Sequence, residues 1–416
     1  MDLTLTIFVL VYVAMGVGHL PGFRLDRTGA ATVGAMLLIA SGEISPAAAW
    51  AAVDYRVIGL LFGLMTVSAA FMVAGFYDWI ANKIGHLLVG PKGLLAILIA
   101  VSGLMSALLN KDVVAVAMAP ILCSICLGRQ LNPLPFLLGF CFAANFGSTA
   151  TLLGSPQNMI VAETLNLSFV GFMEAAAPPA ALSLPLIWVV IVMCYRGRWS
   201  LPDAARPAGG SVAAIAPDAQ VTFSRGETIK AGVVALAVVA AFIFTDVPHM
   251  LIALMGASVL LVSRRIASSN LLHHVNADLL LLLFGLFVVN AAFTATGLPE
   301  QMLARLRDSG LDLHDPPSML LIMAVLSNIV GNNPAVMLVA PFISGSHEPE
   351  ALGAAIVLGT GFSSSAVVFG SLVGIIVAEE CRKRGIALGF VEFARAGVPT
   401  SIICLLIAAL WIHHLG

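Results

Sequence analysis

The chain contains 416 residues, of which 60% are hydrophobic and only 10% are charged, and its formal net charge is −2. Soluble proteins have roughly 45–50% apolar and about 25% charged residues. This composition excludes a soluble globular protein and predicts an all-α polytopic membrane protein, because its apolar runs are long enough to enter a bilayer.

We expect each half of the chain to form five membrane spans and one re-entrant helical hairpin, about ten transmembrane helices in all. In the first half the spans are expected at about 3–20, 28–44, 56–80, 132–165 and 170–195, with the hairpin at about 93–127. In the second half they are expected at about 229–245, 248–263, 278–297, 351–379 and 389–412, with the hairpin at about 317–344. The first segment lacks a basic leader and a small-residue cleavage site, so we expect a span there and not a removed signal peptide.

An internal repeat organises these elements. Five sequence blocks recur in the same order, and four of them align at Gly34/Gly256, Gly63/Gly285, Pro120/Pro341 and Gly154/Gly370, with offsets of 222, 222, 221 and 216. Five matches in register are not expected by chance, so we interpret the chain as two homologous repeats, 1–200 and 226–416. Residues 201–225 are rich in Ala, Pro and Gly and are expected to form a flexible linker.

The basic residues predict the orientation of the chain in the membrane. If the N-terminus is outside, 16 of the 20 lysines and arginines are cytoplasmic, which leaves Arg56, Arg305 and Arg307 outside and Lys111 within the membrane. Such a bias follows the positive-inside rule. Because each repeat has an odd number of spans, the second repeat must be inverted. We therefore expect both termini outside, a cytoplasmic linker, and a multi-pass protein of the cell inner membrane.

Four stretches interrupt the apolar segments with Gly, Pro and polar residues. In the first repeat they are 110–112, at the hairpin tip, and 145–158; in the second they are 327–334 and 359–371. Gly and Pro unwind a membrane helix only where the freed backbone groups line a cavity or find polar partners. Inverted repeats with helices broken near the bilayer midplane are typical of secondary transporters, which bind their solute there.

These four stretches are expected to converge on the solute. The candidate solute-binding residues are Asn110, Asn145, Gly147, Ser148, Thr149, Asn332, Asn333, Ser364 and Ser365. Lys111 and Asp112 are the candidates for proton coupling, because a charge at membrane depth costs at least ~2.5–3.5 kcal/mol and is functional by default. Two structural alternatives stay open: a plain Lys111–Asp112 ion pair, and close helix packing by the small residues of 362–366.

Three segments carry a family resemblance over essentially the whole chain. The segments NPLPFLLGFCFAANFGSTATLLGSPQNMIVAE, SNIVGNNPAVMLVAPFI and RGIALGFVEFARAGVPTS resemble the ion transporter superfamily, specifically its arsenite/antimonite permease branch (arsenical pump membrane protein, ArsB-type), beside the sodium/dicarboxylate carriers. Such relatives have Asn-Asp at the first hairpin tip, where this chain has Lys111-Asp112, and usually Ser-Asn-Val-Pro at the second, where it has 331–334. In sodium-coupled members these positions resemble cation ligands.

The lysine is the informative departure from the family pattern. The repeat aligns Lys111 with Asn332 and Asp112 with Asn333, so a fixed ammonium lies where a sodium-coupled relative places an oxygen ligand. A lysine there can replace the charge of Na⁺ and can be discharged by deprotonation. We therefore favour proton coupling or uniport over sodium coupling, with Asp112 as the proton carrier.

Two functions remain open at this point. The first is export of arsenite or antimonite by proton antiport with alternating access, and hence arsenical resistance, because neutral As(OH)₃ needs hydroxyls and amides rather than an arginine clamp. The alternative is a proton- or sodium-coupled transporter of an anion such as a dicarboxylate, sulfate or phosphate. For an anion, Lys111 and the positive N-terminal ends of the broken helices would bind negative charge.

The sequence gives no sign of enzyme chemistry. It has no metal-ligand spacing, no nucleophile with a base and no P-loop, so neither a metal nor a cofactor is expected. Cys123 and Cys126 form a CxxC, which in a helix merely places two small residues on one face. The expected partners are protons, the lipid bilayer and a small solute, and not nucleic acid. A homodimer and a separate soluble ATPase subunit are both compatible with the sequence.

Overall fold

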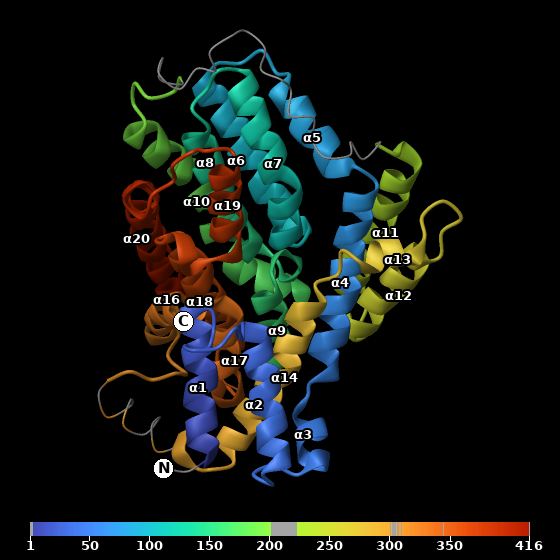
Figure 1. Ribbon diagram of the computed structural model, residues 1–416, viewed down its shortest axis with the longest axis vertical. Coiled ribbons are helices and arrows are strands. Elements are labelled where there is room, and N and C mark those ends of the chain that lie inside the picture. The colour runs from blue at the N-terminus through green and yellow to red at the C-terminus, as the bar shows by residue number, and fades with distance from the viewer. Residues whose placement is uncertain are drawn as a thin grey trace.

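The computed structural model describes residues 3–200, 223–299, 310–343 and 345–415, together with 301, 305 and 308 (Figure 1). These residues are almost entirely helical, and their only extended pairings are two isolated bridges, His19 with Asp26 and Leu131 with Ser200. Seven of the described helices are long and apolar enough to cross a membrane. The protein is therefore a polytopic all-α membrane protein. Residues 201–222 of the predicted linker, which include Arg206, lie outside the described residues, and so does Arg307 in the second half.

The first half contains the helices expected there, with two additional boundaries. Its elements are α1 (Leu3–Val17), α2 (Arg27–Ala40), α3 (Pro46–Ala52), α4 (Tyr55–Val73), α5 (Phe76–Gly85), α6 (Pro91–Leu108), α7 (Lys111–Gly128), α8 (Pro133–Gly147), the 3₁₀ turns η1 (Ser148–Ala150) and η2 (Leu152–Gly154), α9 (Pro156–Leu165) and α10 (Phe169–Cys194). The short α3 was not expected. The predicted span 56–80 is divided, because Gly75 adopts a positive φ of 71° between α4 and α5.

The second half repeats this order. Its elements are α11 (Arg225–Phe244), α12 (His249–Leu261), α13 (Ser268–Leu272), α14 (Ala277–Thr294), α16 (Pro316–Val330), α17 (Asn332–Ile343), α18 (Pro349–Ser363), the 3₁₀ turn η4 (Val368–Gly370), α19 (Leu372–Lys383) and α20 (Phe390–Leu415). The predicted spans 132–165 and 351–379 are each broken in the middle, as expected, by η1 and η2 and by η4. Neither is a single long helix for this reason.

Both hairpins turn sharply, but by different local chemistry. In the first, Asn110 caps α7 by accepting a hydrogen bond from the Asp112 N–H. In the second, Gly331 ends α16 with a φ of 94°, which favours glycine. Asn110 and Gly331 occupy equivalent positions of the repeat. In each hairpin the first helix therefore ends at a residue that does not favour continuation of the helix.

Two pairs of long helices pack closely through glycine, and the pairs are equivalent under the repeat. A Cβ atom added at Gly63 of α4 would lie 2.6 Å from the carbonyl carbon of Ala253 in α12, and one at Gly285 of α14 would lie 2.7 Å from that of Ala31 in α2. The repeat offset of 222 relates Gly63 to Gly285 and Ala31 to Ala253. A two-fold relation makes such contacts reciprocal. Figure 1 shows both pairs, α4 beside α12 and α2 beside α14.

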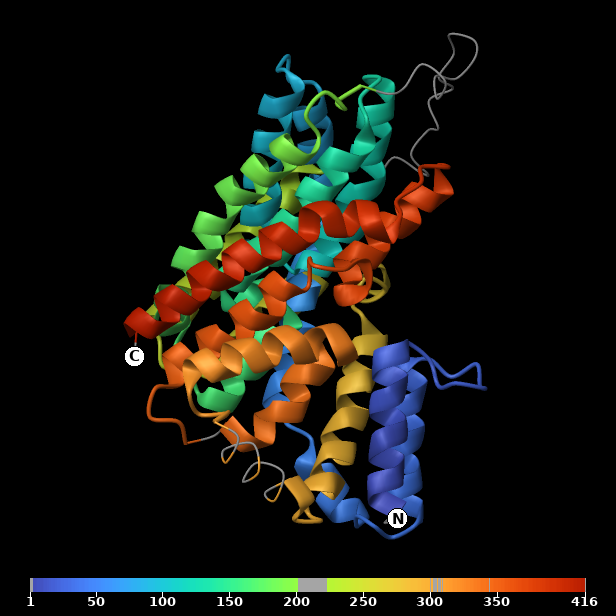
Figure 2. The ribbon, with the colours of Figure 1, turned by 90° about the vertical axis from the view of Figure 1, so that its left-hand side faces the viewer.

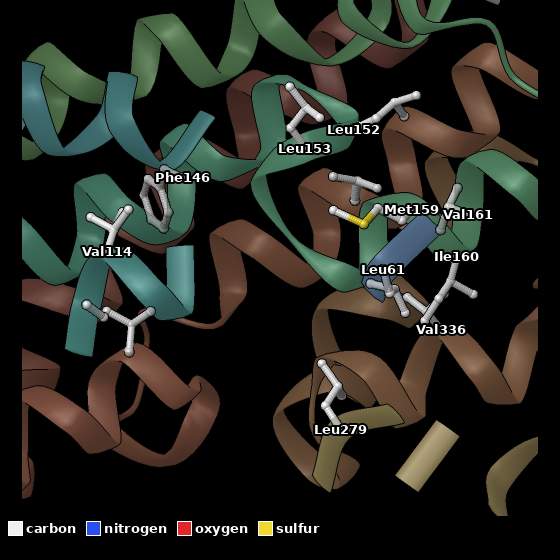
Figure 3. Close-up of a cluster of buried hydrophobic side chains, with 14 of the residues drawn as sticks. Leu61, Val114, Phe146, Leu152, Leu153, Met159, Ile160, Val161, Leu279 and Val336 are labelled. Atoms are coloured by element: carbon white, nitrogen blue, oxygen red, sulfur yellow. The ribbon is translucent and has the colours of Figure 1, made fainter. Parts of the chain in front are cut away.

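The remaining helices enclose a buried core to which both halves contribute. In Figure 2, α20 runs obliquely across the molecule, at an angle to the steep α1, α2 and α14. It packs on α10 and α18. Figure 3 shows Leu61 of α4, 159–161 of α9 and Val336 of α17 converging on one region of this core, while Val114 of α7 faces Phe146 of α8. The hairpins and the broken helices are therefore part of the core.

The glycine contacts give a direct test of the helix packing. We expect Gly63→Val and Gly285→Val each to destabilise the purified protein by about 1–3 kcal/mol, because the added carbons would overlap backbone atoms. Gly232→Val on α11 is the matched control, since a Cβ there meets no atom within 4 Å. Melting temperatures in detergent measure the difference, and equal values for Gly63→Val and the control would contradict the packing.

Candidate functional site

The two broken helices contact each other through buried side chains. Asn145, near the end of α8, donates from Nδ2 to the Oγ atoms of Ser365 at 3.1 Å and Ser371 at 2.9 Å. Gln157 of α9 donates to the hydroxyl of Thr360 in α18 at 3.0 Å. These side chains are buried. The structure thus brings together two of the four interrupted stretches through direct hydrogen bonds between the halves.

The first hairpin tip is fixed from two sides. The Asn110 N–H donates to Ser68 Oγ of α4 at 3.1 Å, and the hydroxyl of Thr151 donates to the carbonyl of Ala107. Gly154 allows the closest approach, because an added Cβ would lie 2.2 Å from the Ser148 carbonyl oxygen and 2.7 Å from that of Ser106. The tip of α6 and α7 therefore packs directly on the unwound stretch that follows α8.

Asn158 supports this unwound stretch. Its Nδ2 donates to the carbonyl oxygens of Ser148 and Thr151, both at 2.7 Å, and the residue is fully buried. A carbonyl that leaves a helix inside a membrane must find a donor, because water is absent there. Asn158 supplies that donor to two carbonyls at once.

The second repeat builds the same arrangement with different side chains. The hydroxyls of Ser327 and Ser363 are 3.0 Å apart, and Asn328 Nδ2 donates to the Ser363 carbonyl at 3.3 Å. A Cβ at Gly370 would lie 2.7 Å from the Ser364 carbonyl oxygen and 2.8 Å from Asn328 Oδ1. Gly370 and Ser364 are the repeat counterparts of Gly154 and Ser148. The second tip therefore also packs on its own unwound stretch.

Lys111 and Asp112 do not pair with each other. Lys111 is only 3% exposed, and within the described part of the chain neither its Nζ nor Asp112 Oδ1 has a hydrogen-bond partner. Successive residues of a helix point in different directions. The Lys111 ammonium lies within electrostatic range of the Asp112 carboxylate, and also of Cys141 on α8, without a direct hydrogen bond to either. The plain ion-pair interpretation is therefore not what the structure shows, and both groups keep their hydrogen-bonding capacity.

Around these charges the buried polar atoms left without partners are mostly acceptors. Among the described residues of the four stretches and their edges they are Ser106 Oγ, Asn145 Oδ1, Ser155 Oγ, Asn158 Oδ1, Asn328 Oδ1, Asn332 Oδ1 and Asn333 Oδ1. For Asn158 and Asn328 the amide orientation is defined, because their Nδ2 atoms face carbonyl oxygens, which can only accept. These oxygens therefore keep unused capacity to accept hydrogen bonds.

Several predicted residues have structural tasks at these stretches. Gly147 packs on α6, where an added Cβ would lie 2.5 Å from the Gly103 carbonyl oxygen. The hydroxyls of Ser148, Thr149 and Ser364 donate to carbonyls three residues earlier in their own helices. Ser365 accepts from Asn145. Asn332 and Asn333 begin α17 at the second tip.

Other residues of the site were not singled out from the sequence. They are Ser68, Gln157, Asn158, Thr360 and Ser371, which make the hydrogen bonds described above, together with Asn290. The repeat carries a signal for one pair: Ser68 of α4 and Asn290 of α14 are related by the offset of 222. Asn290 donates to the Met337 carbonyl of the second hairpin at 2.7 Å and accepts from the Tyr12 hydroxyl. Each hairpin therefore has a polar anchor on the equivalent long helix.

A metal site is not evident in the described ranges, where no group of three or more His, Cys, Asp and Glu side chains is arranged to hold an ion. The six cysteines are free thiols. The polar groups that converge on the site are consequently amides, hydroxyls, backbone carbonyls and the two charges at 111 and 112.

Anchored hairpins, broken helices and buried polar groups define a membrane transporter, and the comparisons with known proteins agree. Residues 10–358 match the citrate transporter family CitMHS. The chain belongs to this family. The "46 kDa membrane protein" of Mycobacterium leprae is 27% identical to it, over 99% of each chain.

Two further relatives match over shorter lengths. The silicon efflux transporter LSI3 of rice, Oryza sativa subsp. japonica, is 29% identical over 47% of this chain and 39% of its own. The "Putative transporter arsB" of Dictyostelium discoideum is 31% identical over 43% of this chain and 31% of its own. Among solved structures, the YdaH transporter of Alcanivorax borkumensis aligns over 100% of this chain and 98% of its own, with a TM-score of 0.56 and 15% identity. That likeness concerns the fold.

Asn158 provides a test of the site's construction. We expect Asn158→Ala to destabilise the protein by about 1–3 kcal/mol for each carbonyl that loses its donor, since both stay buried. Asn82→Ala, at an exposed position on α5, is the control and should leave the melting temperature unchanged. A melting temperature for Asn158→Ala equal to that of the control would show that the unwound stretch does not depend on this amide.

Proposed function

We propose that the protein exports a small neutral hydroxide, arsenite or antimonite, by proton antiport with alternating access. The observation that carries this proposal is the set of unpaired buried acceptor oxygens at the two hairpin tips and the first broken helix. As(OH)₃ brings hydroxyl donors to such acceptors. An ionised carboxylate or sulfate group brings only further acceptors and would leave the amide oxygens unpaired, which costs about 1–3 kcal/mol for each buried group.

The relatives give this proposal secondary support. Silicic acid, like arsenous acid, is a neutral molecule with several hydroxyl groups, and one relative is named as a silicon efflux transporter. Another bears the name arsB. Both match over less than half of this chain, so the geometry of the site remains the main reason for proposing a neutral hydroxide.

An anion is the second candidate, and Lys111 is the observation that favours it. Its ammonium is buried and without a hydrogen-bond partner among the described residues, so a carboxylate, sulfate or phosphate would find a counter-charge at the first tip. The helix N-termini at Pro156 and Leu372, which follow the breaks, add partial positive charge. The family's description as citrate transporters points the same way.

A flux survey separates the two candidates and the coupling ion. Purified protein in proteoliposomes would be given arsenite, antimonite, silicic acid, citrate, succinate, sulfate and phosphate at fixed pH, with and without Na⁺. We expect flux of the neutral hydroxides, dependent on a pH gradient and independent of Na⁺, because Lys111 already supplies a fixed cation. Flux of the anions alone would establish the second candidate, and a sodium requirement at constant pH would refute proton coupling.

Asp112 is the proposed proton carrier, and its substitution tests the role of its charge. Asp112→Asn keeps the shape of the side chain but cannot change charge. Asp112 lies within electrostatic range of Lys111 but makes no direct ion pair with it, so we expect the variant to fold and to exchange solute across the membrane. We expect it to lose accumulation driven by a pH gradient. Full pH-driven accumulation by Asp112→Asn would exclude Asp112 as the carrier.

Variants of Lys111 test the role of its charge in the same way. We expect Lys111→Met to retain a folded protein but to alter coupling, because the fixed cation at the first tip is lost. The double variant Lys111→Met with Asp112→Asn should then resemble the sum of the single changes in melting temperature, as expected for groups that are not paired. A double variant that is much more stable than that sum would restore the ion-pair interpretation.

The orientation is proposed from the basic residues, with both termini outside and the linker in the cytoplasm. A cysteine introduced at Ala213, in the predicted linker, should be labelled by a membrane-impermeant maleimide only after the cells are opened. Cysteines added at the termini should be labelled in intact cells. Labelling of Ala213→Cys from outside would reverse the assignment.

A further inference from the structure

One carboxylate–imidazole contact joins the broken helix of the first half to a long helix of the second. Glu163, in the last turn of α9, lies with Oε1 3.4 Å from Nδ1 of His249, the first residue of α12. The side chains are 11% and 19% exposed. α9 also packs against α4, where Arg56 lies within electrostatic range of Glu163. This contact holds the segment that follows the first unwound stretch against α4 and α12.

The repeat contains the counterpart of both partners. The matching segments 161–163 and 377–379 both read VAE, and the offset of 216 relates Glu163 to Glu379. The offset of 222 relates His249 to Arg27, and each of these is the first residue of its helix. Both equivalent carboxylate positions, 163 and 379, therefore hold glutamate. Both equivalent basic positions hold a basic side chain, His249 in one half and Arg27 in the other.

The counterpart pair is not formed in this structure. Arg27 donates from Nε to the Met15 carbonyl at 2.9 Å. Glu379 pairs with Arg382 on its own helix, and its side chain is 41% exposed. α19 packs on α7 and α8. Its counterpart α9 packs on α17 and α18, which are the repeat equivalents of α7 and α8, and it also packs on α4. The two halves are therefore built alike but occupy different arrangements.

This asymmetry has a direct meaning in a transporter made of inverted repeats. In such proteins alternating access moves one bundle against the other around a fixed site. When the two halves exchange their arrangements, every contact that the first half makes with the second is replaced by its repeat counterpart. The contact between Glu163 and His249 should then be exchanged for one between Glu379 and Arg27.

We propose that Arg27 and Glu379 form a second gate pair, which joins in the opposite access state while the Glu163–His249 pair separates. The proposal rests on the alternating-access part of the proposed function and not on the identity of the solute. Glu379 can exchange its partner at low cost, while Arg27 would have to release the Met15 carbonyl. The present Glu379–Arg382 pair is exposed, and exposed pairs contribute little to stability.

Cross-linking tests the gate pair directly. In a background with the six native cysteines replaced, the pairs Glu163→Cys with His249→Cys and Arg27→Cys with Glu379→Cys would be oxidised in the membrane. A protease site in the predicted linker then separates the halves on a gel unless a disulfide joins them. We expect both pairs to cross-link, and added solute or a pH gradient to change their yields in opposite directions. Arg27→Cys with Arg264→Cys, which is exposed on the second half, is the control.

Charge exchange in the native background gives a second, independent readout. Arg27→Glu opposes Glu379 with a like charge only in the opposite state, so we expect turnover to fall about two- to fivefold, the effect of losing an exposed ion pair. Arg27→Glu combined with Glu379→Arg should restore it. Arg27→Glu also removes the hydrogen bond from Arg27 to the Met15 carbonyl, so rescue of turnover by Glu379→Arg at an unchanged melting temperature of the two variants would show that the effect belongs to the cycle.

The outcomes separate this proposal from the function on which it rests. Cross-linking of positions 27 and 379 at the control's background level, with no rescue by the exchanged charges, in a protein that transports solute, would overturn the gate pair and leave the transporter intact. Cross-linking of both pairs without flux of any surveyed solute would support the gate pair and reject the proposed substrates.

Discussion

The structure depends on how backbone carbonyls are satisfied where helices break inside an apolar medium. Asn158 answers this need in the first half with two hydrogen bonds to carbonyls. In the second half Asn328 donates to the Ser363 carbonyl, and the Ser363 hydroxyl donates to the Thr360 carbonyl. Because these donors must come close, glycines at 154 and 370 allow each unwound stretch to touch its hairpin tip. The polar site exists because these breaks have to be stabilised.

The two halves share this construction but differ in charge. The first tip carries a buried ammonium and carboxylate at 111 and 112, and the equivalent positions of the second carry two asparagines. The first tip therefore offers a cation, a carboxylate and an amide, and the second offers amides and hydroxyls. The electrostatic field of the site is therefore set almost entirely by the first half, while its capacity to accept hydrogen bonds is distributed over both.

Much of the architecture could be predicted from the sequence, because Gly, Pro and Asn mark the broken helices and the predicted repeat places these marks at matching positions in both halves. The division of 56–80 at Gly75 was missed, since the surrounding run stays apolar. The structural alternative of a direct Lys111–Asp112 ion pair is not formed, because neighbours along a helix diverge, although the two charges stay within electrostatic range. Hydrogen bonds such as Asn145 to Ser365 or Gln157 to Thr360 could not be foreseen, because they join positions more than 200 residues apart.

The reciprocal glycine contacts of α4 with α12 and α2 with α14 also bear on how such a site can evolve. In an assembly of two identical chains, a substitution in the contact or at the hairpin tip would appear twice. Here the two halves belong to one chain, so each glycine contact and each hairpin tip can be substituted independently of its counterpart. A single lysine at position 111 is compatible with that freedom, whereas two facing ammonium groups in a symmetric ancestor would repel each other.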